Sequence, residues 1–103
     1  MAILIPTTTA AVTSKPFNAN ANNTGLLANN LGTGETVKLQ VYDETINDYV
    51  DAKIAGVVPK ADSSNNMIAI TQDAFQYRVV KSATVNAVGV AIYQNSVKVG
   101  GYK

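Results

Sequence analysis

The sequence contains no cysteine, no histidine and no tryptophan, and its single arginine is Arg78. Without cysteine, the chain has no disulfide, no thiol nucleophile and no zinc site built on thiolates. Without histidine, it lacks Ser-His-Asp triads, imidazole metal ligands and the most common general base near neutral pH. These absences exclude most familiar catalytic chemistries. We therefore expect a non-enzymatic protein with no catalytic residues, no cofactor and no metal.

Charge is scarce as well, at 15% of the 103 residues against about 25% in ordinary soluble domains. The net charge is +1, and the clustered lysines and arginines of a nucleic-acid-binding surface are missing. The polar surface must come mainly from eleven Asn, ten Thr and five Ser. Because a neutral surface does not repel copies of itself, this composition favours a protein that works in a homo-oligomer or larger assembly.

Long hydrophobic runs are also missing. No stretch approaches the roughly 20 apolar residues of a membrane-spanning helix. The start of the chain lacks the basic and apolar regions of a signal peptide. We therefore expect a protein made in the cytoplasm, without Sec export and without a membrane partner.

What the sequence does have, from Glu35 onward, is the two-residue period of half-buried β-strands. Val37, Leu39 and Val41 share one face of the first such segment, and burying each is worth about 1.5–3 kcal/mol. Only residues 26–31 have the pattern of a short helix. The pattern predicts one all-β domain, a small antiparallel β-sandwich of immunoglobulin-like or jelly-roll-like type. The further strands are expected at 49–55, 67–72, 75–82 and 87–94, with a last one beginning at Val97.

The first third of the chain differs from the rest, because residues 7–34 are largely Thr, Ala, Asn and Gly. β-Branched residues between Pro6 and Pro16 favour an extended backbone. We interpret residues 1–16 as an extended N-terminal arm and residues 17–103 as the β-sandwich domain. The alternative is that the arm is the first strand of that domain.

Such an arm is suited to add a strand to an exposed sheet edge of a partner protein, with main-chain hydrogen bonds supplying affinity. The neutral Asn and Thr residues are concentrated in this part of the chain, which makes it the expected contact surface. The residues predicted to contact the partner are Ile3, Leu4, Ile5, Thr7, Thr8, Thr9 and Val12.

Two groups of residues suggest chemistry but match no site. The densest acidic stretch, from Asp43 to Asp51, lacks the ligand spacing and the glycine of a calcium loop, so we interpret it as a solvated hairpin end. The glycine-rich segment 32–35 lacks the Gly-Lys-Ser/Thr ending of a phosphate-binding loop and is interpreted as a turn.

Among the five tyrosines, Tyr77 alternates with Val79 and is assigned to the core. The segment 73–79 also resembles the turn-into-strand signature of immunoglobulin-like sandwiches, with this tyrosine at the corner. Tyr42 falls on the polar face of its strand. Tyr42 and Tyr49 are the candidate residues for an alternative function, a carbohydrate- or cell-surface-binding module.

Two segments resemble small bacteriophage virion proteins. Residues 35–44, followed by Tyr-Val-Asp-Ala at 49–52, are similar to a hairpin in which a Thr-Val-x-Leu-x-Val strand precedes a polar turn and an aromatic-Val-Asp strand. Tyr-Arg-Val-Val-Lys at 77–81 and Ala-Val-Gly-Val at 87–90 resemble strands near the end of those chains. The resemblance covers residues 35–94 and is one of pattern.

This resemblance implies a β-sandwich on a phage particle, either a head decoration or cement protein or a minor tail component. The implied partner is the major capsid protein or another virion protein, bound by many symmetric copies on the capsid surface. No catalytic residues come with this resemblance.

Overall fold

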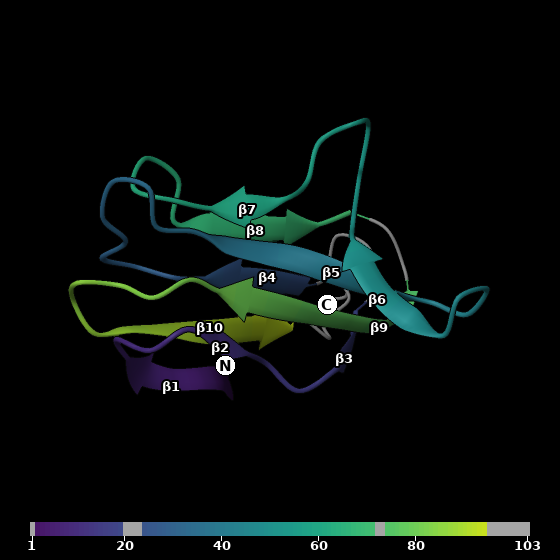
Figure 1. Cartoon of the computed structure of the whole chain (residues 1–103), viewed down its shortest axis with the longest axis horizontal. Helices are drawn as coiled ribbons and strands as arrows, with labels where there is room; N and C mark the ends of the chain where they lie inside the picture. Colours follow the sequence, from purple (N-terminus) through teal and green to yellow (C-terminus); the bar gives the residue numbers. More distant parts are fainter. Residues whose placement is uncertain (1, 20–23, 72–73, 95–103) are drawn as a thin grey trace, which may run out of the picture.

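The computed structural model describes residues 2–19, 24–71 and 74–94, and the elements within these ranges are all β-strands (Figure 1). The all-β prediction is confirmed. Residues 26–31, the only candidate for a short helix, do not form one, because Leu26 and Leu27 pair with strands on both sides instead. The strands are β1 (Ala2–Thr8), β2 (Val12–Thr13), β3 (Phe17–Ala19), β4 (Thr24–Leu27), β5 (Val37–Asp43), β6 (Asp48–Asp51), β7 (Lys60–Ala61), β8 (Met67–Ile70), β9 (Ala74–Lys81) and β10 (Val88–Gln94).

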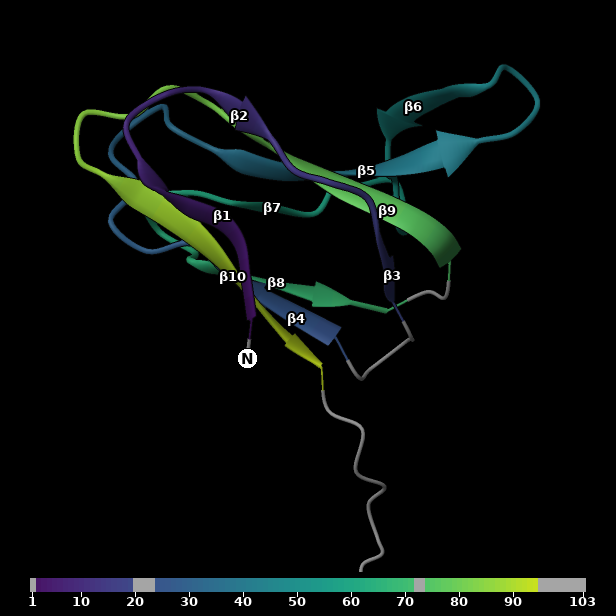
Figure 2. The same ribbon diagram turned by 90° about the horizontal axis from the view of Figure 1, so that it is seen from below.

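Two antiparallel sheets lie face to face (Figure 2). Sheet A has the strand order β1-β10-β4-β8. Sheet B has the order β2-β9-β5-β6, with β3 also pairing with β9 and β7 also pairing with β5. The predicted small β-sandwich is confirmed, and Figure 2 shows the β5–β6 hairpin projecting beyond the two layers.

The core lies between the sheets and follows the predicted alternation. Val37, Leu39 and Val79 of sheet B are fully buried, and Tyr77 is 3% exposed, as its assignment to the core requires. Sheet A contributes a matching inner face of apolar residues from four strands, namely Ile5, Leu26, Ile68, Ile70, Val88, Val90 and Ile92.

The N-terminal segment is part of this sandwich. Residues 2–8 form β1, which pairs with β10 at the edge of sheet A, and Ile5 is only 1% exposed. The chain then crosses to sheet B as β2, where Val12 lies opposite Lys81. The structure therefore corresponds to the alternative interpretation, in which this segment is the first strand of the domain. The physical reason is that Ile5 buries its side chain in the core while the β1 backbone gains hydrogen bonds.

Gly89 explains how β1 approaches β10. The pairing of β1 shifts register on both sides of Ile5, so that its backbone bulges toward Gly89. A Cβ atom at position 89 would lie 2.9 Å from the Ile5 carbonyl oxygen. The close backbone approach that a glycine inside a strand predicts is thus present.

Among the predicted strands, the boundaries differ most at residues 49–55. The strand expected at 49–55 ends at Asp51, because Ala55 and Gly56 have φ values of 54° and 82° and Ile54 pairs with Val57 across a tight turn. The strand predicted from Val97 and Asp73, the first residue of the 73–79 signature, lie outside the described residues.

Candidate interaction surface

The outer face of sheet A carries an apolar row that crosses all four strands. Ile3 of β1 lies opposite Ala91 of β10, Ala91 opposite Leu27 of β4, and Leu27 opposite Met67 of β8. Directly opposed residues on one sheet face have Cβ atoms about 4.5–5.5 Å apart, so these four side chains form a continuous strip. We call it the apolar row.

Both ends of the apolar row are open to solvent: Ile3 is 63% exposed and Met67 is 51% exposed. A parallel line of Tyr93, Gly25 and Ala69 lies beside it on the same face. No charged residue occurs in β1, β4, β8 or β10. The outer face of sheet A is therefore uncharged and partly apolar.

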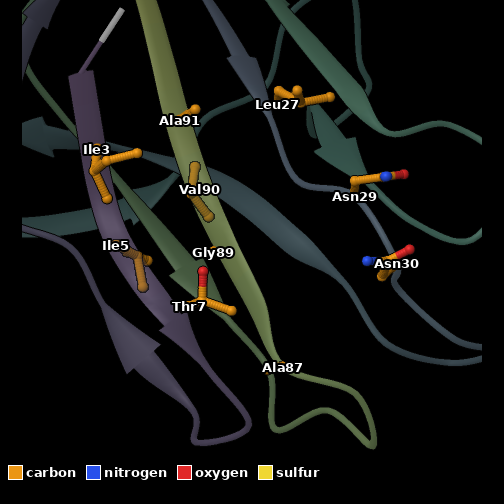
Figure 3. A pocket seen from close by; sticks show the side chains of 10 residues that line it. All are labelled: Ile3, Ile5, Thr7, Leu27, Asn29, Asn30, Ala87, Gly89, Val90 and Ala91. Atoms are coloured by element: carbon orange, nitrogen blue, oxygen red, sulfur yellow. The ribbon is translucent and has the colours of Figure 1, made fainter.

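A hollow of about 270 Å³ opens on this face between β1 and β4. Gly89 and Ala91 of β10 form its floor, and the larger side chains of Ile3 and Leu27 stand on either side (Figure 3). Small-molecule sites span about 300–1,000 Å³. The hollow is thus better matched to one inserted side chain than to a cofactor.

The charged residues of the described chain lie outside these four strands, and two of them, Lys60 and Asp62, line a hollow together with Met67 at the β8 edge. They belong to the strands of sheet B or to connecting segments, and they are Lys15, Glu35, Lys38, Asp43, Glu44, Asp48, Asp51, Lys53, Lys60, Asp62, Arg78 and Lys81. From the sequence alone, only the first third of the chain could be identified as poor in charged residues. Pairing of β1 and β4 with the equally uncharged β8 and β10 extends the neutral region across one face.

The structure does not bring the seven residues predicted to contact a partner onto one surface. Ile5 is in the core, and Leu4 and Val12 pack against it, so these three side chains are directed to the protein's own interior. Thr8 is half-buried, whereas Thr9 is exposed in the segment after β1. Only Ile3 and Thr7 reach the hollow on the outer face of sheet A with exposed side chains.

The outer face of sheet B is different, because it combines tyrosines with polar and charged side chains. The rings of Tyr42 and Tyr49 meet edge to face with centroids 5.2 Å apart. The Arg78 guanidinium carbon lies 4.0 Å from the centroid of the Tyr49 ring. The two predicted tyrosines are therefore brought together, with an arginine that sequence reasoning did not include.

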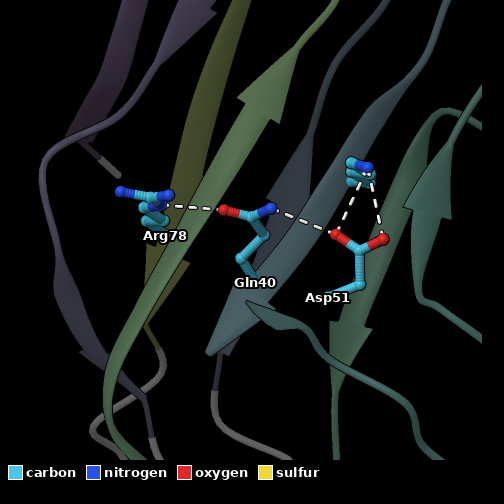
Figure 4. Close-up of polar contacts among 4 residues, drawn as sticks. Gln40, Asp51 and Arg78 are labelled. Atoms are coloured by element: carbon cyan, nitrogen blue, oxygen red, sulfur yellow. Dashed lines mark hydrogen bonds and ion pairs between the residues drawn. The ribbon is translucent and has the colours of Figure 1, made fainter. Parts of the chain in front are cut away.

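A line of hydrogen bonds crosses the same face (Figure 4). Arg78 Nε donates to Gln40 Oε1 at 2.8 Å, and Gln40 Nε2 donates to Asp51 Oδ1 at 3.1 Å. Asp51 also forms an ion pair with Lys38 at 3.2 Å. Hydrogen bonds from Gln40 and Lys38 hold the pKa of the Asp51 carboxyl below its ordinary value.

The acidic stretch forms a hairpin end, as predicted. Asp43 and Asp48 face each other where β5 meets β6, and Asp43 Oδ1 accepts hydrogen bonds from the hydroxyl and backbone N–H of Thr45. These bonds lower the pKa of Asp43. In residues 2–19, 24–71 and 74–94, no group of three or more acidic side chains is arranged to hold a metal ion.

One buried polar network was not predicted. Lys81 is fully buried, and its Nζ donates to the Ala10 carbonyl at 2.7 Å and to Thr84 Oγ1 at 3.2 Å. Glu35 accepts from the backbone N–H groups of Gly32 at 2.6 Å and Val85 at 2.8 Å. The network joins three chain segments at one end of the sandwich.

The two charges in this network have pKa values below their ordinary values for different reasons. Burial disfavours the ammonium form and lowers the pKa of Lys81, partly opposed by the charge of Glu35. Hydrogen bonds from the Gly32 and Val85 backbone lower the pKa of Glu35. Lys81 has the same strand parity as Tyr77 and Val79, a signal that could have identified it as inward-facing.

No protein-family model, no curated protein and no solved structure matches this chain. The described part of the chain also contains no helix long and apolar enough to cross a membrane.

Proposed function

We propose that this chain is a non-enzymatic structural protein of a bacteriophage particle, a decoration or cement protein that attaches to capsid protein through the outer face of sheet A. The observation that carries the proposal is the uncharged face crossed by the apolar row, from Ile3 to Met67. The resemblance of residues 35–94 to phage virion proteins supports the choice of partner.

The chemistry of the face defines the partner surface. Burying a charged side chain without a counter-charge is costly, whereas apolar and small neutral groups are buried at a gain. A capsid surface that covers the apolar row would therefore be uncharged at the contact and would present one side chain to the hollow above Gly89. This differs from the expected arm, since Ile5 is retained in the core.

The size of the face favours attachment by many copies. Strands lie about 4.8 Å apart and rise about 3.3 Å per residue, so four strands of four to seven residues present roughly 250–450 Å². Stable interfaces bury about 800 Å² on each partner. A single contact of this size is weak, and a symmetric array on a particle, in which neighbouring copies also touch, gains by multivalency.

Locating the chain on particles tests the proposal. Particles purified from the virus whose genome encodes the chain would be imaged by electron microscopy, with copy number measured by mass spectrometry. We expect density on the outside of the head at symmetry-related positions. Density confined to the tail would favour the tail-component alternative, and absence from purified particles would refute a virion role.

A further inference from the structure

Arg78 has a guanidinium group that its neighbours hold in place and that has no counter-charge among the described residues. Its Nε is bonded to Gln40, and its carbon lies over Tyr49. Among the described residues, the only ion pair joins Lys38 to Asp51, so Arg78 has no carboxylate of its own. Its terminal Nη groups make no hydrogen bond to described residues.

The orientation of this guanidinium is fixed from both sides. Gln40 uses its carbonyl oxygen for Arg78 and its amide nitrogen for Asp51, and Asp51 is in turn held by Lys38. Its position over the Tyr49 ring restrains the group further. A planar fork that is already oriented loses less conformational entropy when it binds a carboxylate through two parallel hydrogen bonds.

The neighbouring groups indicate what kind of carboxylate fits. Tyr42 and Tyr49 are half-buried with rings in contact, and their hydroxyls are bonded to Asn47 at 3.2 Å and to Gln76 at 3.3 Å. Aromatic rings beside amide side chains match a sugar, which offers C–H faces together with hydroxyl groups. A carboxylate without a ring or apolar face beside it would leave the tyrosine pair without a contact.

We propose that the Arg78–Tyr49–Tyr42 cluster on the outer face of sheet B binds an acidic sugar, with the guanidinium receiving the carboxylate of a uronic acid and the tyrosines contacting its ring. The site is on the opposite face from the apolar row and does not depend on the function proposed above. Even a bidentate guanidinium–carboxylate pair is a modest interaction when it is exposed to solvent. A single site is therefore weak, and a ligand with several acidic sugars would gain avidity wherever several copies of the chain are held together.

The test uses the full chain and NMR titration with trigalacturonic acid. The matching neutral galactose trimer and triglutamate are the comparison ligands. We expect shifts of the Arg78 Nε–H and Tyr49 ring signals, and at least tenfold tighter binding of the acidic sugar than of either comparison ligand. Equal binding of the neutral trimer, tighter binding of triglutamate, or no shift at Arg78 would overturn the proposal.

Variants distinguish binding by the guanidinium fork of Arg78 from simple attraction to a positive charge. Arg78→Lys keeps the charge but loses the fork and is expected to weaken trigalacturonate at least fivefold, as is Tyr42→Ala. Lys60→Gln removes an exposed cation elsewhere on sheet B and should leave affinity unchanged. Unchanged binding by Arg78→Lys together with a loss in Lys60→Gln, with both proteins folded by circular dichroism, would show non-specific charge attraction and refute the site.

Discussion

At the scale of single residues, Gly89 is the position where the absence of a side chain matters most. An added Cβ would meet the Ile5 carbonyl oxygen at 2.9 Å and the Thr7 backbone nitrogen at 3.1 Å. Both are backbone atoms, so β1 must move to relieve the contact. Gly89→Ala is expected to lower the free energy of unfolding by about 1–3 kcal/mol, as in other overpacked sites.

Urea denaturation measures this effect, and Gly25→Ala is the matched control. Gly25 is in the neighbouring strand of the same sheet, but its added Cβ would lie no closer than 3.8 Å to another atom. The control variant should unfold near the urea concentration of the unchanged chain. Equal stability of the two variants would contradict the close approach of β1 to β10.

The lowered pKa of Glu35 predicts how the stability of the folded chain changes at low pH. Its pKa is lowered in the folded state, so it contributes stability above its ordinary value of 4.5, and this is lost as pH falls through the lower folded value. Glu35→Gln should therefore flatten the fall in urea midpoint below pH 4.5. Asp43, Asp51 and Asp62 also have lowered pKa values, so part of the slope should remain. An unchanged slope would contradict this role.

Lys81 acts at the alkaline end with the opposite sign. Its folded pKa is below the ordinary value of 10.5, so the unfolded chain binds the proton more tightly in the window between the two values. Stability is expected to rise with pH in that window, and the rise should disappear in Lys81→Met. Urea midpoints measured across this range test this prediction, with Lys60→Met as the control at an exposed lysine. A rise that persists in Lys81→Met would contradict it.

At the scale of elements, β1 tests whether the N-terminal segment belongs to the sandwich. Ile5→Ala removes a side chain that is 1% exposed and should cost about 2–5 kcal/mol. Ile3→Ala removes one that is 63% exposed and should change stability by less than about 0.5 kcal/mol. Equal small effects on the free energy of unfolding would instead indicate a free arm.

The elements also show what the sequence can predict. Strands β5, β8, β9 and β10 lie where two-residue alternation placed them, because alternation depends only on which face is buried. The pairing of β1 with β10 brings together residues nearly ninety positions apart, for example Ala2 with Ile92. Local pattern carries no information on such pairing, and residues 2–8 read equally well as an arm or a strand.

The candidate sites were predicted less well than the fold, for the same reason. Tyr42 and Tyr49 were identified from residue type, but the stacking of Arg78 on Tyr49 depends on β9 lying beside β5. The apolar row likewise joins one residue from each of four separate strands. None of the four stands out in its own segment, and only the register of sheet A aligns them.

At the scale of the whole molecule, the central feature is the division between an uncharged face and a charged one. The described charges belong to sheet B and the connecting segments, while the strands of sheet A have none. The uncharged part of the surface thus lies on one side of the sandwich. This division predicts that a new charge on the outer face of sheet A prevents attachment, whereas a new charge on the side that already has charges is tolerated.

Attachment of charge variants to particles that lack the chain tests this claim most directly. Ile3→Lys and Met67→Lys place a charge at either end of the apolar row, whereas Ile46→Lys makes the same change at a 57% exposed position in the β5–β6 turn. In co-sedimentation, we expect the first two variants to bind at least tenfold more weakly and the third to bind like the unchanged chain. Full binding by Ile3→Lys and Met67→Lys, or an equal loss in Ile46→Lys, would contradict attachment through sheet A.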